Sequence, residues 1–160
     1  RYHTNLPMLV DKLRAAGAAA VTLFNRSYQI DIDLNREQLI GGEVFSREGD
    51  FTETLRFTGV IRGCVPNVGI SASTGIYTWE ELTKVLLAGA DTAQMCTAVY
   101  KQGATAIAEA LKGLRHWMIE HGYQSLSELR GRLSYGAVAD PSLFERIQFM
   151  KYFNARAAQD

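Results

Sequence analysis

The sequence is poor in cysteine, has no long apolar run and carries no excess charge of either sign. Its two cysteines, Cys64 and Cys96, are too few for a disulfide framework and favour a reducing, cytoplasmic setting. No apolar run reaches the roughly 20 residues that a membrane-spanning helix needs. Seventeen basic residues balance seventeen acidic ones, whereas a nucleic-acid-binding face is normally basic. We therefore expect neither a membrane nor a nucleic acid as a partner.

Short apolar runs alternate along the chain with amphipathic helical patterns. The runs predict parallel strands that are buried on both faces, at residues 18–24, 68–73 and 93–99. The helical patterns lie at residues 6–16, 52–62, 79–88 and 104–121, with a last helix from Asp140 through Ile147 and Met150. Such alternation of strands and helices predicts a parallel α/β architecture.

Local signals mark the ends of these helices. Asn5 is a candidate N-cap of the first helix, and Thr78 with Glu81 forms a capping box before the third. Gly63 is expected to end the second helix. Residues 28–50, by contrast, show little periodicity and predict a long irregular excursion. A loop of that length in a compact domain is usually functional or covers something.

The predicted fold class is therefore α/β, with about three parallel strands, flanking helices and a helical tail. A TIM (β/α)8 barrel needs about 250 residues, while this chain has 160 and begins with Arg1 rather than Met. Its content matches the last three βα units of such a barrel, preceded by one extra helix. We interpret residues 1–160 as a single partial domain, the C-terminal half of a barrel whose N-terminal half lies elsewhere. A small open sheet is the alternative.

Two strand ends together predict an anion-binding site. Ser73, Thr74 and Gly75 follow the second strand and precede the capped helix. A glycine turn lets backbone N–H groups approach a phosphate, and a helix N-terminus adds partial positive charge. Cys96 and Thr97 follow about 20 residues later on the next strand, and in barrels the loops after strands seven and eight often form such a site. The alternative is a tight turn followed by an ordinary capped helix.

Asn25 is the other candidate site residue, because it follows the first strand. Ligands of α/β sheets bind at the carboxyl ends of strands, and an amide suits a planar amide or carboxylate ligand. A turn-forming asparagine is an equally good interpretation. No cluster of His, Cys and Asp has the spacing of a metal site. His116 and His121 are expected to be solvated on a helix.

Six segments, in order and at matching spacing, resemble the dihydroorotate dehydrogenases and their close relatives, which are FMN-binding barrels. They are residues 23–34, 73–78, 86–90, 96–103 and 122–125, and the pair Arg130-Gly131. The resemblance covers nearly the whole chain. It implies an FMN-dependent oxidoreductase that converts dihydroorotate to orotate in de novo pyrimidine (UMP) biosynthesis.

The resemblance also implies roles for residues of this chain, carried over by position. The FMN phosphate would be held by Ser73, Thr74, Gly75, Cys96 and Thr97, and Asn25 would contact the substrate. In the family, the base that removes a substrate proton lies in the first half of the barrel. Nothing in this sequence matches it, so the chain is expected to contain no catalytic residue and to be inactive in isolation.

Three positions depart from the family pattern. Thr74 and Cys96 stand where glycines are common, and a side chain there narrows the approach of a phosphate to the backbone. Arg26 follows Asn25 where serine or threonine is usual, so the substrate is not fixed as dihydroorotate. The alternatives are a fragment of another phosphate-binding barrel, such as a sugar-phosphate isomerase or aldolase, and a non-catalytic half-barrel that binds ligands.

A half-barrel leaves two strand edges unpaired and uncovers strand faces. Val21, Leu23, Ile70 and Met95 lie in the predicted strands, and some of them are expected to face the open side. We therefore expect the chain to be stable only with the missing half of the barrel or with a self-associated copy, as a homo-oligomer.

Overall fold

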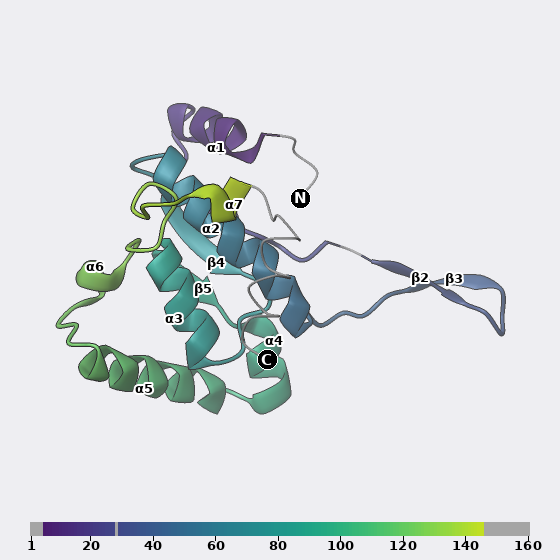
Figure 1. Cartoon of the computed structure of the whole chain (residues 1–160). Coiled ribbons are helices and arrows are strands. Elements are labelled where there is room, and N and C mark those ends of the chain that lie inside the picture. Colours follow the sequence, from purple (N-terminus) through teal and green to yellow (C-terminus); the bar gives the residue numbers. More distant parts are fainter. Residues whose placement is uncertain (1–4, 28, 146–160) are drawn as a thin grey trace, which may run out of the picture.

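The computed structural model describes residues 5–27 and 29–145 of the chain. Within them, three strands form a parallel sheet in the order β1–β4–β5, and two form an antiparallel ribbon. The strands are β1 (Ala20–Leu23), β2 (Ile30–Asp33), β3 (Gln38–Gly41), β4 (Gly69–Ser73) and β5 (Thr92–Gln94). The helices are α1 (Leu6–Ala15), η1 (Glu48–Asp50), α2 (Phe51–Cys64), α3 (Trp79–Ala88), α4 (Cys96–Gln102), α5 (Thr105–Glu120), α6 (Leu126–Leu129) and α7 (Ser142–Glu145). The predicted parallel α/β architecture is thereby confirmed (Figure 1).

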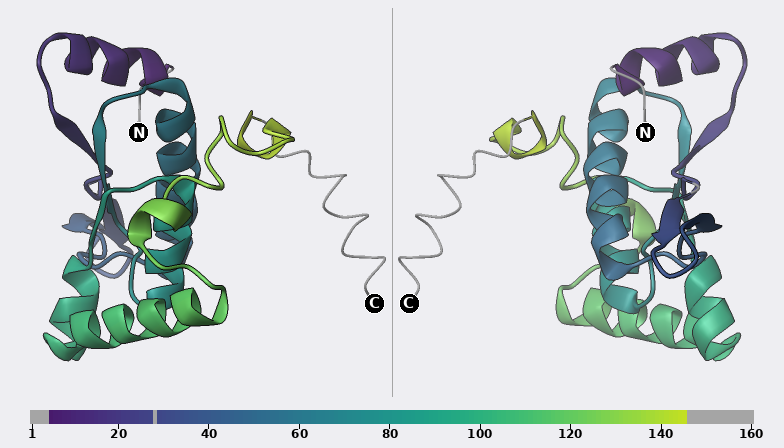
Figure 2. Two further views of the ribbon diagram at one scale, coloured as in Figure 1. Left: turned by 90° about the vertical axis from the view of Figure 1, so that its left-hand side faces the viewer. Right: turned by 90° about the vertical axis from the view of Figure 1, so that its right-hand side faces the viewer.

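The main core lies between the sheet and the helices on one of its faces, with α2 alongside the strands (Figure 2). Leu23, Ile70 and Ile61 are buried together in it, at 3%, 1% and 0% exposure. The Phe57 ring of α2 stands edge-on to the Phe24 ring, with 5.4 Å between the centroids. Because full burial of each such side chain contributes roughly 1.5–3 kcal/mol, this layer holds the helices to the strands.

The opposite face of the sheet carries small and polar side chains. Thr22 pairs with Ser71 across β1 and β4, and Gln94 Nε2 donates to Ser71 Oγ at 3.1 Å. The expectation of uncovered apolar strand residues is wrong, because successive side chains of a strand alternate between faces. All four residues concerned pack against the helix-side clusters: Val21, Leu23, Ile70 and Met95. β1 is likewise not buried on both faces, since Thr22 is exposed.

Both predicted caps are confirmed. Asn5 Oδ1 accepts from the Met8 amide at 3.0 Å, and Thr78 with Glu81 forms the reciprocal capping box of α3. Glu81 Oε2 accepts from the Thr78 amide at 2.9 Å. Burial raises the pKa of Glu81, but hydrogen bonds from the side chain and backbone of Thr78 lower it, so that the pKa lies below its ordinary value of 4.5. α3 then ends at Gly89, which adopts φ +121°.

The prediction that residues 28–50 form an irregular excursion is wrong in part, because some of these residues form a hairpin. In β2 and β3, Ile30 lies opposite Gly41 and Ile32 opposite Leu39. These residues share one face of the ribbon, and the three large side chains on that face are exposed. The ribbon projects from the body of the molecule (Figure 1).

Two helix and strand boundaries also differ from the prediction. α2 continues through Gly63, where a Cβ would lie 2.4 Å from the Gly136 nitrogen, so this glycine lets the C-terminal segment pack against the helix. The third strand ends at Gln94, and Cys96 and Thr97 begin α4 instead of ending a strand. The last helix is described through Glu145, as α7; Ile147 and Met150 lie outside the described residues.

No helix in the described part of the chain is long and apolar enough to cross a membrane.

Candidate functional site

A cavity of about 220 Å³ lies at the carboxyl ends of the three parallel strands. Every residue predicted from the sequence to form a site lines it: Asn25, Ser73, Thr74, Gly75, Cys96 and Thr97. Five further residues complete the lining and were not predicted to belong to a site: Arg26, Val44, Ser46, Ile76 and Gln94. The three strand ends and the excursion after β1 therefore converge on one space.

Parallel pairing explains why residues so far apart in sequence meet here. Leu23 of β1 lies opposite Ala72 of β4, and Ser73 lies opposite Gln94 of β5. The carboxyl ends of the strands are thus level with one another. The Phe24 amide extends the ladder by donating to the Ser73 carbonyl at 3.1 Å, which brings the residue after it, Asn25, to the same edge.

The Thr74 hydroxyl is engaged by the backbone of the neighbouring strand end. Thr74 adopts φ +87°, which is rare for a β-branched residue. Its hydroxyl donates to the Phe24 carbonyl at 2.8 Å. The buried hydroxyl of Thr54 on α2 donates to the Ser73 carbonyl at 2.8 Å. The turn after β4 is therefore fixed by two threonine hydroxyls.

Gly75 is required by the packing of α2. It adopts φ +77°, and a Cβ there would lie 2.5 Å from the backbone nitrogen of Phe51 and 2.7 Å from its Cα. From the sequence alone, this glycine is expected to let a phosphate approach the backbone. The structure shows another reason for it: the turn after β4 touches the first residue of α2 with no room for a side chain.

Three hydroxyl groups meet at one side of the cavity. Ser46 Oγ donates to Thr97 Oγ1 at 3.0 Å, and the Ser46 amide reaches the same oxygen at 3.3 Å. The Tyr77 hydroxyl donates to the Ser46 carbonyl and lies 3.1 Å from Ser46 Oγ. The excursion after β1 is therefore attached to the residues that follow β4 and β5.

Among the described residues that line the cavity, Arg26 is the charged one. Its contacts are with other residues of the excursion after β1. Its guanidinium donates to the Glu43 carbonyl, reaches Gln29 Oε1 at 3.4 Å and pairs with Asp50 at 3.5 Å. Nearby, a hydrogen bond and the charge of Arg47 lower the pKa of Glu43. The cation is thus engaged by three groups of the protein.

The side-chain amide of Asn25, in contrast, makes no hydrogen bond within residues 5–27 and 29–145. It is exposed and lines the cavity. A free amide at the end of a strand can both donate to and accept from a planar polar ligand.

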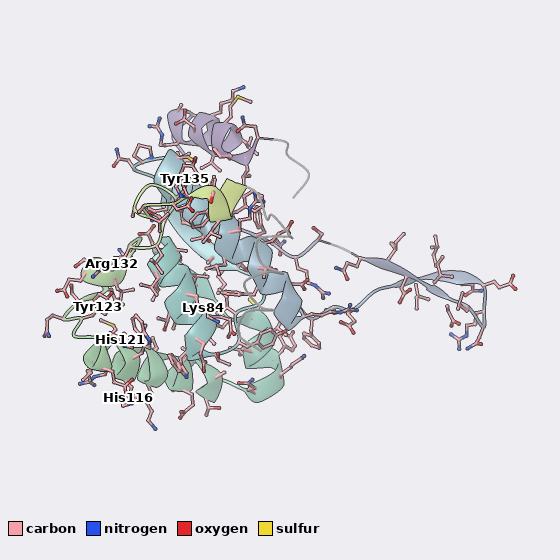
Figure 3. The ribbon with its side chains drawn as sticks, in the orientation of Figure 1. Lys84, His116, His121, Tyr123, Arg132 and Tyr135 are labelled. Carbon is pink, nitrogen blue, oxygen red and sulfur yellow. The ribbon has the colours of Figure 1, made fainter. Side chains whose placement is uncertain are left out.

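The two histidines and Cys64 do not line this cavity. His116 is exposed on α5 and His121 directly after it (Figure 3). The His121 ring stacks on Trp117 with 4.1 Å between the ring centroids. Cys64 and Cys96 are free thiols. Within the part of the chain that the structure describes, no group of three or more His, Cys, Asp or Glu residues is placed to hold a metal.

No family model matches this chain. The catalytic subunit of dihydroorotate dehydrogenase B (NAD(+)) from Pyrococcus furiosus is 32% identical to it over 133 residues, which are 80% of this chain and 42% of that protein. The same subunit from Pyrococcus abyssi is 33% identical over 121 residues, 72% of this chain and 40% of that protein. The NAD-dependent dihydropyrimidine dehydrogenase subunit PreA from Escherichia coli is 37% identical over 62 residues, 39% of this chain and 15% of that protein.

The resemblance predicted from the six segments is thereby confirmed. The chain spans about 40% of the length of the two Pyrococcus relatives.

Proposed function

We propose that this chain, which belongs to the dihydroorotate dehydrogenase-like family, holds the phosphate of FMN and forms one wall of the substrate site of an oxidoreductase. The observation that carries the proposal is the single cavity lined by all six residues that the family pattern assigns to cofactor and substrate. The proposed reaction of the whole protein is the oxidation of dihydroorotate to orotate in pyrimidine biosynthesis.

The residues around the cavity suit a phosphate and not a complete flavin. Pockets that enclose a whole drug-sized ligand usually measure about 300–1,000 Å³, whereas this cavity measures about 220 Å³. Residues 73–76 and 96–97 line it, so we assign the phosphate to their backbone N–H groups and to the hydroxyl of Thr97. Thr74, which replaces a glycine of the family pattern, leaves this approach open because its hydroxyl is turned to the Phe24 carbonyl.

The chemistry divides between the cofactor and the protein. FMN, when bound, accepts the hydride, while the protein binds and orients the reactants. Asn25 is the residue of this chain that we assign to the substrate, because its free amide can orient a pyrimidine carbonyl or N–H group. In the family pattern the base lies in the first half of the barrel, and no residue of this chain matches it. We therefore place the base that removes the substrate proton outside this chain and expect the chain alone to be inactive.

A dihydropyrimidine without a carboxylate is the second candidate substrate. Dihydroorotate carries a carboxylate, for which an arginine is the usual partner. Arg26, the charged residue of the described lining, is engaged by Glu43, Gln29 and Asp50. The similarity to the Escherichia coli dihydropyrimidine dehydrogenase subunit points in the same direction.

We also propose that this chain is completed by further strands, which would close the sheet into a barrel. β1 and β5 are the outer strands of the parallel sheet, and unpaired edges of this kind readily pair with other strands. These strands would come from the first half of the barrel or from a second copy of the chain. Two relatives are named as catalytic subunits, which is consistent with assembly.

The test is the spectrum of the native protein that carries this chain. It should purify yellow, and heating should release FMN of the correct mass. Anaerobic addition of dihydroorotate should bleach the flavin, whereas faster bleaching by dihydrouracil would select the second candidate. A protein without bound flavin, or one that neither compound reduces, would contradict the proposal.

A further inference from the structure

The excursion between β1 and α2 brings a buried hydroxyl to the cavity. Ser46 is only 7% exposed and lies in the wall between the 220 Å³ cavity and a neighbouring cavity of about 480 Å³. It belongs to a segment to which the sequence assigned no site residue, and neither strand-end pattern includes it. Its contacts reach residues that follow β4 and β5.

The hydrogen bonds around Ser46 have a direction. Tyr77 uses its hydroxyl proton on the Ser46 carbonyl, and Ser46 uses its own on Thr97 Oγ1. Thr97 Oγ1 also accepts from the Ser46 amide. A hydroxyl has one proton and two lone pairs, so both acceptor sites of Thr97 are filled. Within residues 5–27 and 29–145, Thr97 donates to no acceptor.

The remaining proton of Thr97 is therefore available to the cavity that the residue lines. A hydroxyl whose lone pairs accept hydrogen bonds is polarised and becomes a better donor. Hydrogen bonds from such donors to an anion are stronger than those between neutral groups. Ser46 thus prepares Thr97 to donate to a negatively charged group.

We propose that Ser46 is a positioning residue for the cofactor phosphate: it fixes the Thr97 hydroxyl as a donor that points into the cavity. This inference rests on the proposed function, since it presumes that the anion in the cavity is the FMN phosphate. The excursion after β1 would then be a third segment of the phosphate site, beside the residues that follow β4 and β5. Arg26 helps to hold the same excursion, because its guanidinium binds the Glu43 carbonyl and pairs with Asp50.

The test compares FMN with riboflavin, which lacks the phosphate, in the native protein stripped of its flavin. Ser46→Ala should raise the Kd for FMN about three- to tenfold, the range expected for one lost hydrogen bond, and leave the Kd for riboflavin unchanged. Ser134→Ala is the matched control, because Ser134 is similarly buried, at 5% exposure, and does not line the cavity. It should change neither Kd.

A double-mutant cycle with Thr97→Val tests whether Ser46 acts through Thr97. If it does, the double variant should bind FMN no more weakly than Thr97→Val alone, because coupled residues are not additive. Additive losses would overturn the positioning role, as would an unchanged preference for FMN over riboflavin in Ser46→Ala. Equal weakening of both ligands would show a purely structural role and would also overturn it.

The parent protein separates this inference from the proposed function. A parent that binds riboflavin as tightly as FMN would overturn the phosphate site itself, and this inference with it. A parent that prefers FMN, together with a Ser46→Ala variant that keeps the full preference, would overturn the role of Ser46 and leave the proposed function standing.

Discussion

Replacing Gly75 with alanine tests the structural reason for the glycine turn after β4. Gly75 adopts φ +77°, which costs an L-residue roughly 1–2 kcal/mol. The new Cβ would also lie 2.5 Å from the Phe51 nitrogen, and overpacking of this kind typically costs about 1–3 kcal/mol more. The expected loss is therefore about 2–5 kcal/mol, a large part of the roughly 5–15 kcal/mol by which domains are stable.

Gly122→Ala is the matched control for the Gly75 variant. Gly122 adopts φ +75°, and a Cβ there would meet nothing within 4 Å, so only the backbone cost of roughly 1–2 kcal/mol applies. Urea unfolding of the native protein and both variants gives the two losses, provided that the m-value stays constant. Equal losses would refute the reasoning that Gly75 makes room for α2. If Gly75→Ala loses more stability than Gly122→Ala, the substitution displaces α2. Weaker flavin binding in Gly75→Ala would then be caused in part by that displacement.

Three further predictions follow from the site, the α3 cap and the open sheet. Asn25→Ala should slow flavin reduction in rapid-mixing absorbance experiments without changing flavin content, because its amide is free to bind the substrate; equal loss of both would make Asn25 structural. Glu81 has a folded pKa below 4.5, so it contributes stability above pH 4.5 that is lost as the pH falls through the folded pKa. Melting temperatures should therefore fall less steeply with acid in Glu81→Gln than in the parent, and identical slopes would exclude the cap as a cause. Ultracentrifugation of the 160-residue chain alone should show self-association through the strand edges, and a cooperative, well-folded monomer at micromolar concentration would contradict this.

Local signals predicted the parts of this fold that local forces decide. The box at Thr78 and Glu81 satisfies backbone groups within one helical turn, so the residues alone specify it. The gathering of Asn25, Thr74 and Thr97 in one cavity also followed from sequence, because parallel strands place their carboxyl ends at the same edge.

Features that depend on contacts between distant segments could not be predicted from the local sequence. Ser46 meets Thr97 across 51 positions of sequence, and a serine in a polar loop is common and unspecific. The sequence marks Gly75 only as a turn glycine, and its contact with Phe51 appears only in the structure. The same limit explains the strand faces: the apolar character of Leu23 and Ile70 predicted burial, but only packing decides which face of a sheet the helices cover.

The hairpin of β2 and β3 was missed for a different reason. The Ile-Asp-Ile-Asp alternation at residues 30–33 has the period of a strand, but it is short and its apolar side chains lie in solvent. Ile30 and Ile32 are exposed at 68% and 57%, so no burial accompanies the pattern in the described part of the chain. An alternation of this length is easily mistaken for a loop when aspartates and glycines surround it.

A crystal structure of the native protein with FMN would test most directly whether this chain holds the cofactor phosphate. We predict the phosphate in the cavity between residues 74–76 and 96–97, within hydrogen-bonding distance of Thr97 Oγ1, with Ser46 still donating to that oxygen. A phosphate bound elsewhere would contradict the assignment, for example in the neighbouring cavity that Tyr77 and Lys101 line.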